Sequence, residues 1–132
     1  MRDIQNNISA VQSIKPSSYT ATENGDAVDL RGFSAALALF YLWAGDYANA
    51  DEVYTPKLQE SNDATNWNDV AAGDLEGSFT ATDEQAGEGL QSAGYKGSKR
   101  YLRAVVVVAG TSPSVVGFGT IVLGEPHQAP AA

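Results

Sequence analysis

The side chains that most often carry out catalysis or bind transition metals are scarce in this sequence. His127 is the only histidine, and there is no cysteine to form a disulfide or act as a nucleophile. A general base must be held rigidly against its substrate, but His127 lies between Pro126 and Gln128 in a Pro/Ala-rich segment that is predicted to be flexible. Zinc and similar metals need several nitrogen or sulfur ligands. We therefore expect no catalytic residue, no cofactor and no metal ligand around these side chains.

Acidic side chains are more plentiful, but their spacing selects no site. Two segments offer the oxygen atoms that calcium binds: residues 23–29 (ENGDAVD) and residues 62–69 (NDATNWND). Neither has the alternating acidic residues and distal glutamate of a calcium loop, and Asn and Asp are ordinary turn formers. The sixteen carboxylates also single out no pair for glycoside hydrolysis. The chain has neither a nucleophile elbow nor a phosphate-binding glycine loop, so we expect it not to be an enzyme.

One group of basic residues interrupts a chain whose net charge is −8. Lys96, Lys99, Arg100 and Arg103 fall close together. They would either form a solvated turn and the polar face of a strand, or contact an acidic partner surface. The overall negative charge disfavours direct binding of nucleic acid and of anionic membranes, because both need clustered Lys and Arg.

Length and composition predict a single domain with one core, made without an export signal. Charged residues make up 18% of the chain, below the roughly 25% of an ordinary soluble domain. The segment MRDIQNNISAVQSI lacks the apolar centre of a signal peptide. The longest apolar runs are shorter than the roughly 20 residues of a transmembrane helix. We expect a soluble protein, and the lack of cysteine suits assembly in a reducing cytoplasm.

The segment VYTPKLQESNDATNWNDV, residues 53–70, is predicted to organise the fold. Its first half alternates, so that Tyr54, Pro56 and Leu58 share one face of a strand. Because proline donates no ladder hydrogen bond, Pro56 places that strand at an edge or a bulge. After a Ser-Asn-Asp turn the chain returns through Trp67, which we predict to be a structural anchor at the end of the core. The alternative is that Trp67 is an exposed platform on which a sugar or a base stacks.

Other segments also favour β structure. Residues 33–45 (FSAALALFYLWAG) are predicted to form a strand covered on both faces, because glycines bound the run and no helix N-cap precedes it. Residues 99–110 (KRYLRAVVVVAG) contain four consecutive valines, which favour a strand, and residues 115–124 are predicted to pair back on it. About eight short strands without a long helix predict an all-β, jelly-roll-like β-sandwich.

The two ends of the chain are predicted to lie outside this sandwich, which we assign to residues 15–124. Residues 1–14 form an N-terminal arm or the first strand; whether this segment is helical, extended or a strand stays open. Ile4 and Ile8 are apolar side chains in a polar context, and in an arm they would contact a neighbouring subunit or another protein of the same assembly. Residues 125–132 are predicted to form a flexible C-terminal tail.

Four segments together resemble a known family. The order NNISAVQSI, YTPKLQESNDATNWNDV, YKGSKRYLRAVVVVAG and GEPHQAP, which spans nearly the whole chain, is similar to the head cement (decoration) proteins of tailed bacteriophages, which are encoded beside the major capsid protein. The resemblance implies a jelly-roll-like homodimer or homotrimer on the outer surface of the phage head. Such a protein binds the major capsid protein shell, bridges capsomers and stabilises the mature head. The family supplies no catalytic residues; the candidate partner contacts are Ile4, Ile8, Lys96, Lys99, Arg100 and Arg103.

Two alternatives remain open at this point. The segment KLQESNDATNWNDV also resembles the strand-turn-Trp part of discoidin-like jelly rolls, which act as carbohydrate-binding modules through their loops. A tail or baseplate component would share the virion with a cement protein but not its location on the head.

Overall fold

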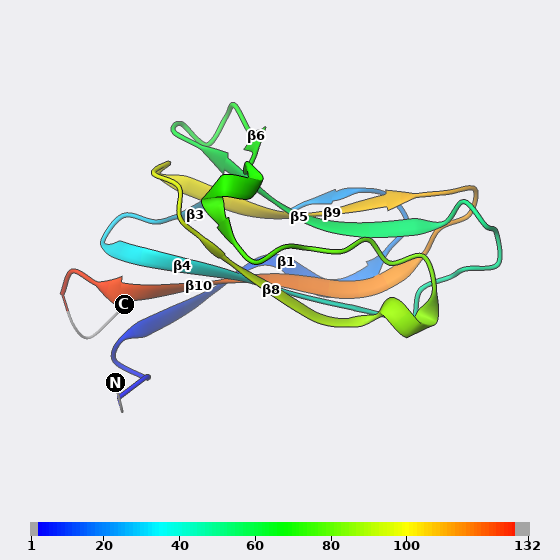
Figure 1. Cartoon of the computed structure of the whole chain (residues 1–132), viewed down its shortest axis with the longest axis horizontal. Coiled ribbons are helices and arrows are strands. Elements are labelled where there is room, and N and C mark those ends of the chain that lie inside the picture. Colours follow the sequence, from blue (N-terminus) through cyan, green and yellow to red (C-terminus); the bar gives the residue numbers. More distant parts are fainter. Residues whose placement is uncertain (1–2, 129–132) are drawn as a thin grey trace.

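The computed structural model describes residues 3–128, and nearly all of its regular structure is β-strand (Figure 1). Two short 3-10 turns, η1 (Ala72–Asp74) and η2 (Gln85–Gly87), interrupt the strands. No helix in this part of the chain has the length and apolar character needed to cross a bilayer. The strands are β1 (Ile8–Tyr19), β2 (Glu23–Asn24), β3 (Val28–Asp29), β4 (Phe33–Trp43), β5 (Val53–Ser61), β6 (Asn68–Asp69), β7 (Leu75–Glu76), β8 (Gly89–Tyr95), β9 (Tyr101–Ala109) and β10 (Val115–Pro126).

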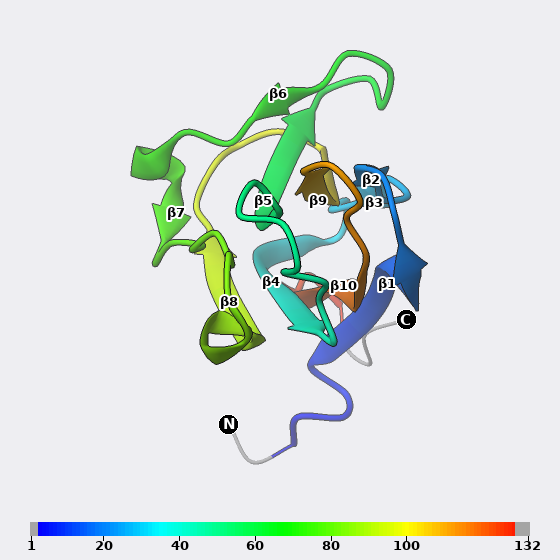
Figure 2. The same cartoon turned by 90° about the vertical axis from the view of Figure 1, so that its right-hand side faces the viewer.

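The strands form two antiparallel sheets that pack face to face, which confirms the predicted all-β sandwich (Figure 2). Sheet A has the order β1-β10-β4-β8-β7, and sheet B has the order β2-β9-β5-β6, with β3 also paired to β9. If β2 and β3 count as one interrupted strand and β7 as an edge addition, residues 3–128 contain eight strands. Sheet A then reads 1-8-3-6 and sheet B reads 2-7-4-5. First pairs with last, second with seventh, third with sixth and fourth with fifth, which is the connectivity of a jelly roll.

The core lies between the two sheets and follows the alternation of the strands. Tyr54, Pro56 and Leu58 on β5 point inward, as their spacing predicts. Pro56 is also at a sheet edge, as predicted. Strand β6 pairs with β5 only at Gln59 and Glu60, so it does not reach Pro56. The largest buried apolar side chains are Tyr54, Phe40, Ile14, Leu42, Leu102 and Ile121.

Strand β10 does not pair with the strand that precedes it, so this prediction is wrong. It lies between β1 and β4 in sheet A, whereas β9 is in sheet B. The glycines of β10 explain the arrangement: a Cβ at Gly119 would lie 2.8 Å from the Cβ of Ala104 on β9 and 3.2 Å from the ring of Phe40. Two strongly apolar strands therefore face each other across the core rather than sharing a ladder.

Residues 8–14 and 125–127, which the sequence assigned to an arm or first strand and to a flexible tail, are held by backbone hydrogen bonds of sheet A and its margin. Strand β1 begins at Ile8 and pairs with β10, so the first-strand alternative applies from that residue onward. Ile4 precedes it and is 55% exposed. At the other end β10 extends to Pro126, and the backbone N–H of His127 donates to the carbonyl oxygen of Gly32 at 2.8 Å. The predicted flexible tail is therefore wrong for residues 125–127, because they continue a ladder; residues 129–132 lie outside the described part of the chain.

Candidate functional site

A pocket of about 610 Å³ opens beside the start of β4. Its walls come from the β3–β4 turn, from the end of β8, from the β8–β9 loop and from His127 beyond β10. These walls come from three stretches that lie far apart in the sequence, residues 30–36, residues 95–100 and His127, and the jelly-roll connectivity brings them to one end of the sandwich. The volume lies in the range typical of ligand-binding pockets.

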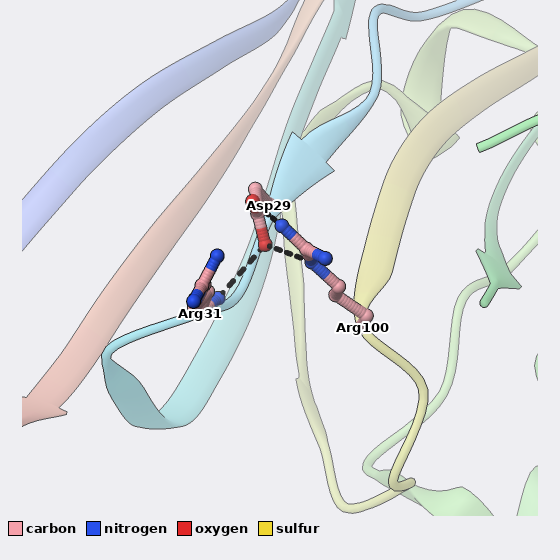
Figure 3. A network of polar contacts seen from close by, with 3 residues as sticks. All are labelled: Asp29, Arg31 and Arg100. Atoms are coloured by element: carbon pink, nitrogen blue, oxygen red, sulfur yellow. Dashed lines mark hydrogen bonds and ion pairs between the residues drawn. The ribbon is translucent and has the colours of Figure 1, made fainter. Parts of the chain in front are cut away.

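Positive charge gathers at this pocket, although the chain as a whole is acidic. Arg31, Lys99 and Arg100 line it, together with His127. Arg100 forms a two-point contact with Asp29, with Nη2–Oδ2 at 2.9 Å and Nε–Oδ1 at 3.2 Å (Figure 3). The hydrogen bond from Arg100 lowers the pKa of Asp29, so this carboxylate stays ionised and neutralises one guanidinium.

The other two cations of the pocket remain available to a partner. Within residues 3–128 the ion pairs are Lys57–Asp69, Lys96–Glu76 and Arg100–Asp29, so neither Arg31 nor Lys99 takes part in one. Only the backbone N–H of Arg31 contacts Asp29, at 3.0 Å. The arrangement can accept a carboxylate or another anion through charge-assisted hydrogen bonds. We call this pocket, with Arg31, Lys99 and Arg100, the cationic pocket.

His127 has a defined position, contrary to the expectation that nothing orients it. Its Nε2 lies 3.0 Å from the hydroxyl oxygen of Ser34 on β4. Both side chains are exposed, and no carboxylate among the described residues hydrogen-bonds to the imidazole. A nucleophile activated by a base usually needs a third group to orient that base. The absence of enzymatic activity stays a prediction.

The basic residues singled out in the sequence divide between separate places. Lys99 and Arg100 reach the cationic pocket. Lys96 instead pairs with Glu76 at 3.1 Å, and Arg103 donates from Nε to the side-chain oxygen of Gln59 at 2.8 Å. Arg31 was missed, and His127 was assigned no binding role, because the sequence does not place either residue near Lys99. The basic residues that are neighbours in sequence therefore do not form one patch. The pocket instead combines two of them with residues from distant segments.

Trp67 is not the core anchor that the sequence predicted. It is only half-buried in the β5–β6 connection, outside the hydrophobic core cluster, and the Arg103 guanidinium carbon lies 4.5 Å from its ring centroid. The preceding turn is organised by Asp63, whose pKa is lowered by hydrogen bonds from the backbone N–H groups of Asn66 and Thr65. Within the acidic segment 62–69, Asp63 thus uses its oxygen atoms in its own turn, and Asp69 uses its carboxylate to bind Lys57 and Gln59 on β5. No group of three or more potential metal-ligating side chains gathers anywhere in residues 3–128.

We expect Trp67→Ala to lower the free energy of unfolding by only about 1–2 kcal/mol. The change removes one exposed cation–π contact and part of a buried surface, but it leaves no cavity in the core. Urea unfolding followed by circular dichroism measures the difference. A loss above about 3 kcal/mol, as expected for a buried anchor, would show that Trp67 is a structural anchor of the core after all.

A second surface of different chemistry lies on sheet A. The residues of β4 alternate, with Ala36, Ala38, Phe40 and Leu42 buried against sheet B. Their neighbours point away from the core, and the register aligns them with outward residues of β10 and β8. We call this surface the apolar face; its large side chains are Leu37, Leu39, Tyr41, Trp43, Leu90, Val116, Phe118 and Val122.

The apolar face is open to solvent in the described part of the chain. Tyr41, Trp43 and Leu90 are 39%, 59% and 63% exposed, and the rings of Tyr41 and Phe118 stack at 6.1 Å with an interplanar angle of 9°. The prediction that the β4 segment is covered on both faces is therefore wrong within one copy of the chain. Ile8 pairs with Gly124, and Gly124 pairs with Ala35, which points outward on β4. Ile8 therefore lies on the same side of sheet A as the apolar face.

The fold and its two surfaces define the class of protein as a jelly-roll β-sandwich. No family model and no curated protein sequence matches the chain. Among solved structures, the PBSX exported protein XepA is similar, with a TM-score of 0.57 and 17% sequence identity over 94% of this chain. The chain spans 39% of the XepA chain, and the likeness shows a shared fold.

A second solved structure is more distant. It contains the CBM22-1 and GH10 modules of xylanase 10B from Clostridium thermocellum, complexed with xylohexaose. The TM-score is 0.38 with 11% identity, over 92% of this chain and 29% of the other. A likeness at this level supports no inference about function.

Proposed function

We propose that this protein is a structural component of a phage particle, a cement or decoration protein that binds the outer surface of the major capsid protein shell. It bridges capsomers and so stabilises the mature head. The observation that carries the proposal is that one jelly roll presents two contact surfaces of different chemistry, the cationic pocket and the apolar face. A protein that bridges neighbours needs more than one such surface. The similarity to XepA, a phage-derived protein, supports the phage context.

The cationic pocket is the surface that we assign to the shell. Arg31 and Lys99 are free of ion pairs within residues 3–128 and would receive an acidic side chain of the major capsid protein. The net charge of −8 repels an acidic surface at long range, but salt screens that repulsion beyond about 10 Å. Modest affinity per contact is sufficient on a lattice, because linked copies raise one another's effective concentration.

The double variant Arg31→Gln and Lys99→Gln is expected to bind purified heads that lack the protein at least roughly tenfold more weakly than the wild type. It removes two charge-assisted contacts, of which one is sufficient for a change of that size. Cosedimentation with heads measures the binding. The control is Lys57→Gln, which removes one positive charge from β5, where Lys57 pairs with Asp69.

Three outcomes separate the possibilities. A wild-type protein that does not bind heads contradicts the proposed function. Binding to purified tails instead of heads would identify a tail or baseplate component. If Lys57→Gln lost half as much binding free energy as the double variant, the effect per charge would be the same; only overall charge would then matter, and the pocket would be removed from the contact.

A carbohydrate-binding module is the second candidate, and one observation favours it. Trp43 is 59% exposed beside the stacked rings of Tyr41 and Phe118, and flat exposed aromatic surfaces can stack on sugar rings. Titration with soluble oligosaccharides should then change the tryptophan fluorescence, and Trp43→Ala should abolish the change. An unchanged spectrum at millimolar sugar would eliminate this candidate.

A further inference from the structure

The apolar face lacks the second covering layer that its strand composition requires. Strand β4 reads FSAALALFYLW, a nearly continuous apolar run, and such runs are typical of strands covered on both faces. Sheet B covers only the inner side, and in residues 3–128 no strand covers the outer side (Figures 1 and 2). The apolar residues packed around the core do not include Leu37, Leu39 or Phe118.

From this mismatch we propose that the apolar face packs against the same face of a second copy of this chain, forming a two-fold dimer of stacked sandwiches. The inference deepens the proposed function and rests on it for its place in a particle, because it names the partner of the second contact surface. Two faces of one kind are self-complementary under two-fold symmetry. Two sheets pack naturally face to face at about 10 Å.

Charge favours a second copy as the occupant. Two copies that each carry −8 repel each other through most of their surfaces. The outward residues of the paired parts of β10, β4 and β8 include no Lys, Arg, Asp or Glu. The charged residues within the strands of this sheet lie at its margins: Lys15 on β1, Glu76 on β7 and Glu125 near the end of β10. Packing this face on itself therefore brings no like charges together, and it leaves a polar rim around an apolar centre, as interfaces have.

The size of the face also fits a dimer. Residues 35–43 of β4 extend about 27 Å at about 3.4 Å per residue, and four strands at about 4.8 Å spacing cover about 19 Å. The product is roughly 500 Å² on each copy, or on the order of 1,000 Å² for the pair, which reaches the size expected of a specific interface. An apolar patch of this extent is as large as the largest patch on a typical monomeric protein, and such patches are often functional.

Leu39 marks the centre of the proposed contact. It pairs with Thr120 on one side and with Ser92 on the other, midway along the aligned part of β4. Near a two-fold axis a residue meets its own equivalent, so a charge at Leu39 faces the same charge in the second copy. Opposite charges on the two copies would instead attract each other.

The test uses the full chain with Leu39→Glu and, separately, Leu39→Lys. Analytical ultracentrifugation at tens of micromolar should show twice the mass of the chain for the wild type. Each variant alone should be monomeric, with its dissociation constant raised roughly 30-fold or more, and an equimolar mixture should restore the dimer. Thr55→Glu is the matched control, because this residue is on β5 in sheet B and adjoins the inward Tyr54; it should remain dimeric.

The mixture distinguishes lost pairing from lost folding, since misfolded variants do not recover a dimer when mixed. A monomeric wild type, or Leu39 variants that stay dimeric, overturns the proposal, and so do two folded monomers that fail to pair. Binding to heads is measured on the same samples. A wild-type dimer that does not bind heads contradicts the proposed function alone. If the wild type is a monomer and the Leu39 variants lose binding to heads, the dimer proposal is overturned. The apolar face would then be the surface that contacts the capsid shell.

Discussion

Replacing Tyr54 by alanine is expected to lower the free energy of unfolding by about 3–5 kcal/mol, the cost of removing a large aromatic side chain from a core. Tyr54 is fully buried, and its ring packs edge-on against Tyr47 at 5.6 Å. Its hydroxyl donates to the carbonyl oxygen of Asp46 at 2.6 Å and accepts the backbone N–H of Ser114 at 3.0 Å. One side chain thus connects β5 with two loops of the sandwich. Chemical denaturation followed by circular dichroism measures the loss.

Tyr54→Phe separates the ring from its hydrogen bonds. This variant keeps the packing but leaves a buried carbonyl and N–H without their partner, so we expect a loss of about 1–3 kcal/mol. Trp67→Ala is the comparison within the same segment, because it removes a larger side chain that is only half-buried. If Trp67→Ala were more costly than Tyr54→Ala, the assignment of Tyr54 as the anchor would be wrong.

Gly25→Ala is expected to destabilise the fold by about 3 kcal/mol or more, the upper part of the range for overpacking. A Cβ at Gly25 would lie 2.7 Å from the carbonyl oxygen of Ala104 and 2.9 Å from that of Ser13, and it would also meet the Ser13 hydroxyl. These atoms are backbone or hydrogen-bonded, so they cannot simply move aside. The N–H of Gly25 donates to Ala104 at 2.7 Å, and the Ser13 hydroxyl accepts the N–H of Ala104 at 2.9 Å. The substitution therefore forces apart β1 and β9, which belong to different sheets.

Gly73→Ala is the matched control for this prediction. A Cβ there meets no atom within 4 Å, and surface changes of this kind usually stay within about 0.5 kcal/mol. Thermal unfolding of both variants measures the difference. Similar melting temperatures for the two would show that the contact around Gly25 relaxes at little cost.

The sequence was sufficient for the fold class, because strand alternation is a local signal. Tyr54, Pro56 and Leu58 follow a period of two and are buried as that period predicts. Trp67 follows a turn and belongs to no such pattern, so its size alone suggested a core position. The alternation of inward and outward positions along a strand, and not side-chain volume, thus determines which aromatic residue is buried.

Long-range features were not accessible in the same way. The pairing of β10 with β1 and β4 depends on how closely the sheets approach at Gly119, which no local pattern reveals. The cationic pocket joins Arg31 to Lys99 from segments that the sequence separates. The apolar run of β4 predicts a covering layer on each side, and within one copy of the chain only sheet B covers it.

The pairing of the first strand with the last also has a consequence for synthesis of the protein. Strand β4 leaves the ribosome with its apolar side chains exposed. Its neighbour β10 begins at Val115, which is 72 residues after β4 ends at Trp43. At about 5–20 residues per second this delay is about 4–14 s. For most of that time, until β8 begins at Gly89, 46 residues after Trp43, the most apolar strand of the chain has neither of its partners in sheet A. Expression is therefore expected to be limited by aggregation of the nascent chain, and slower growth or additional chaperone should raise the yield of folded protein.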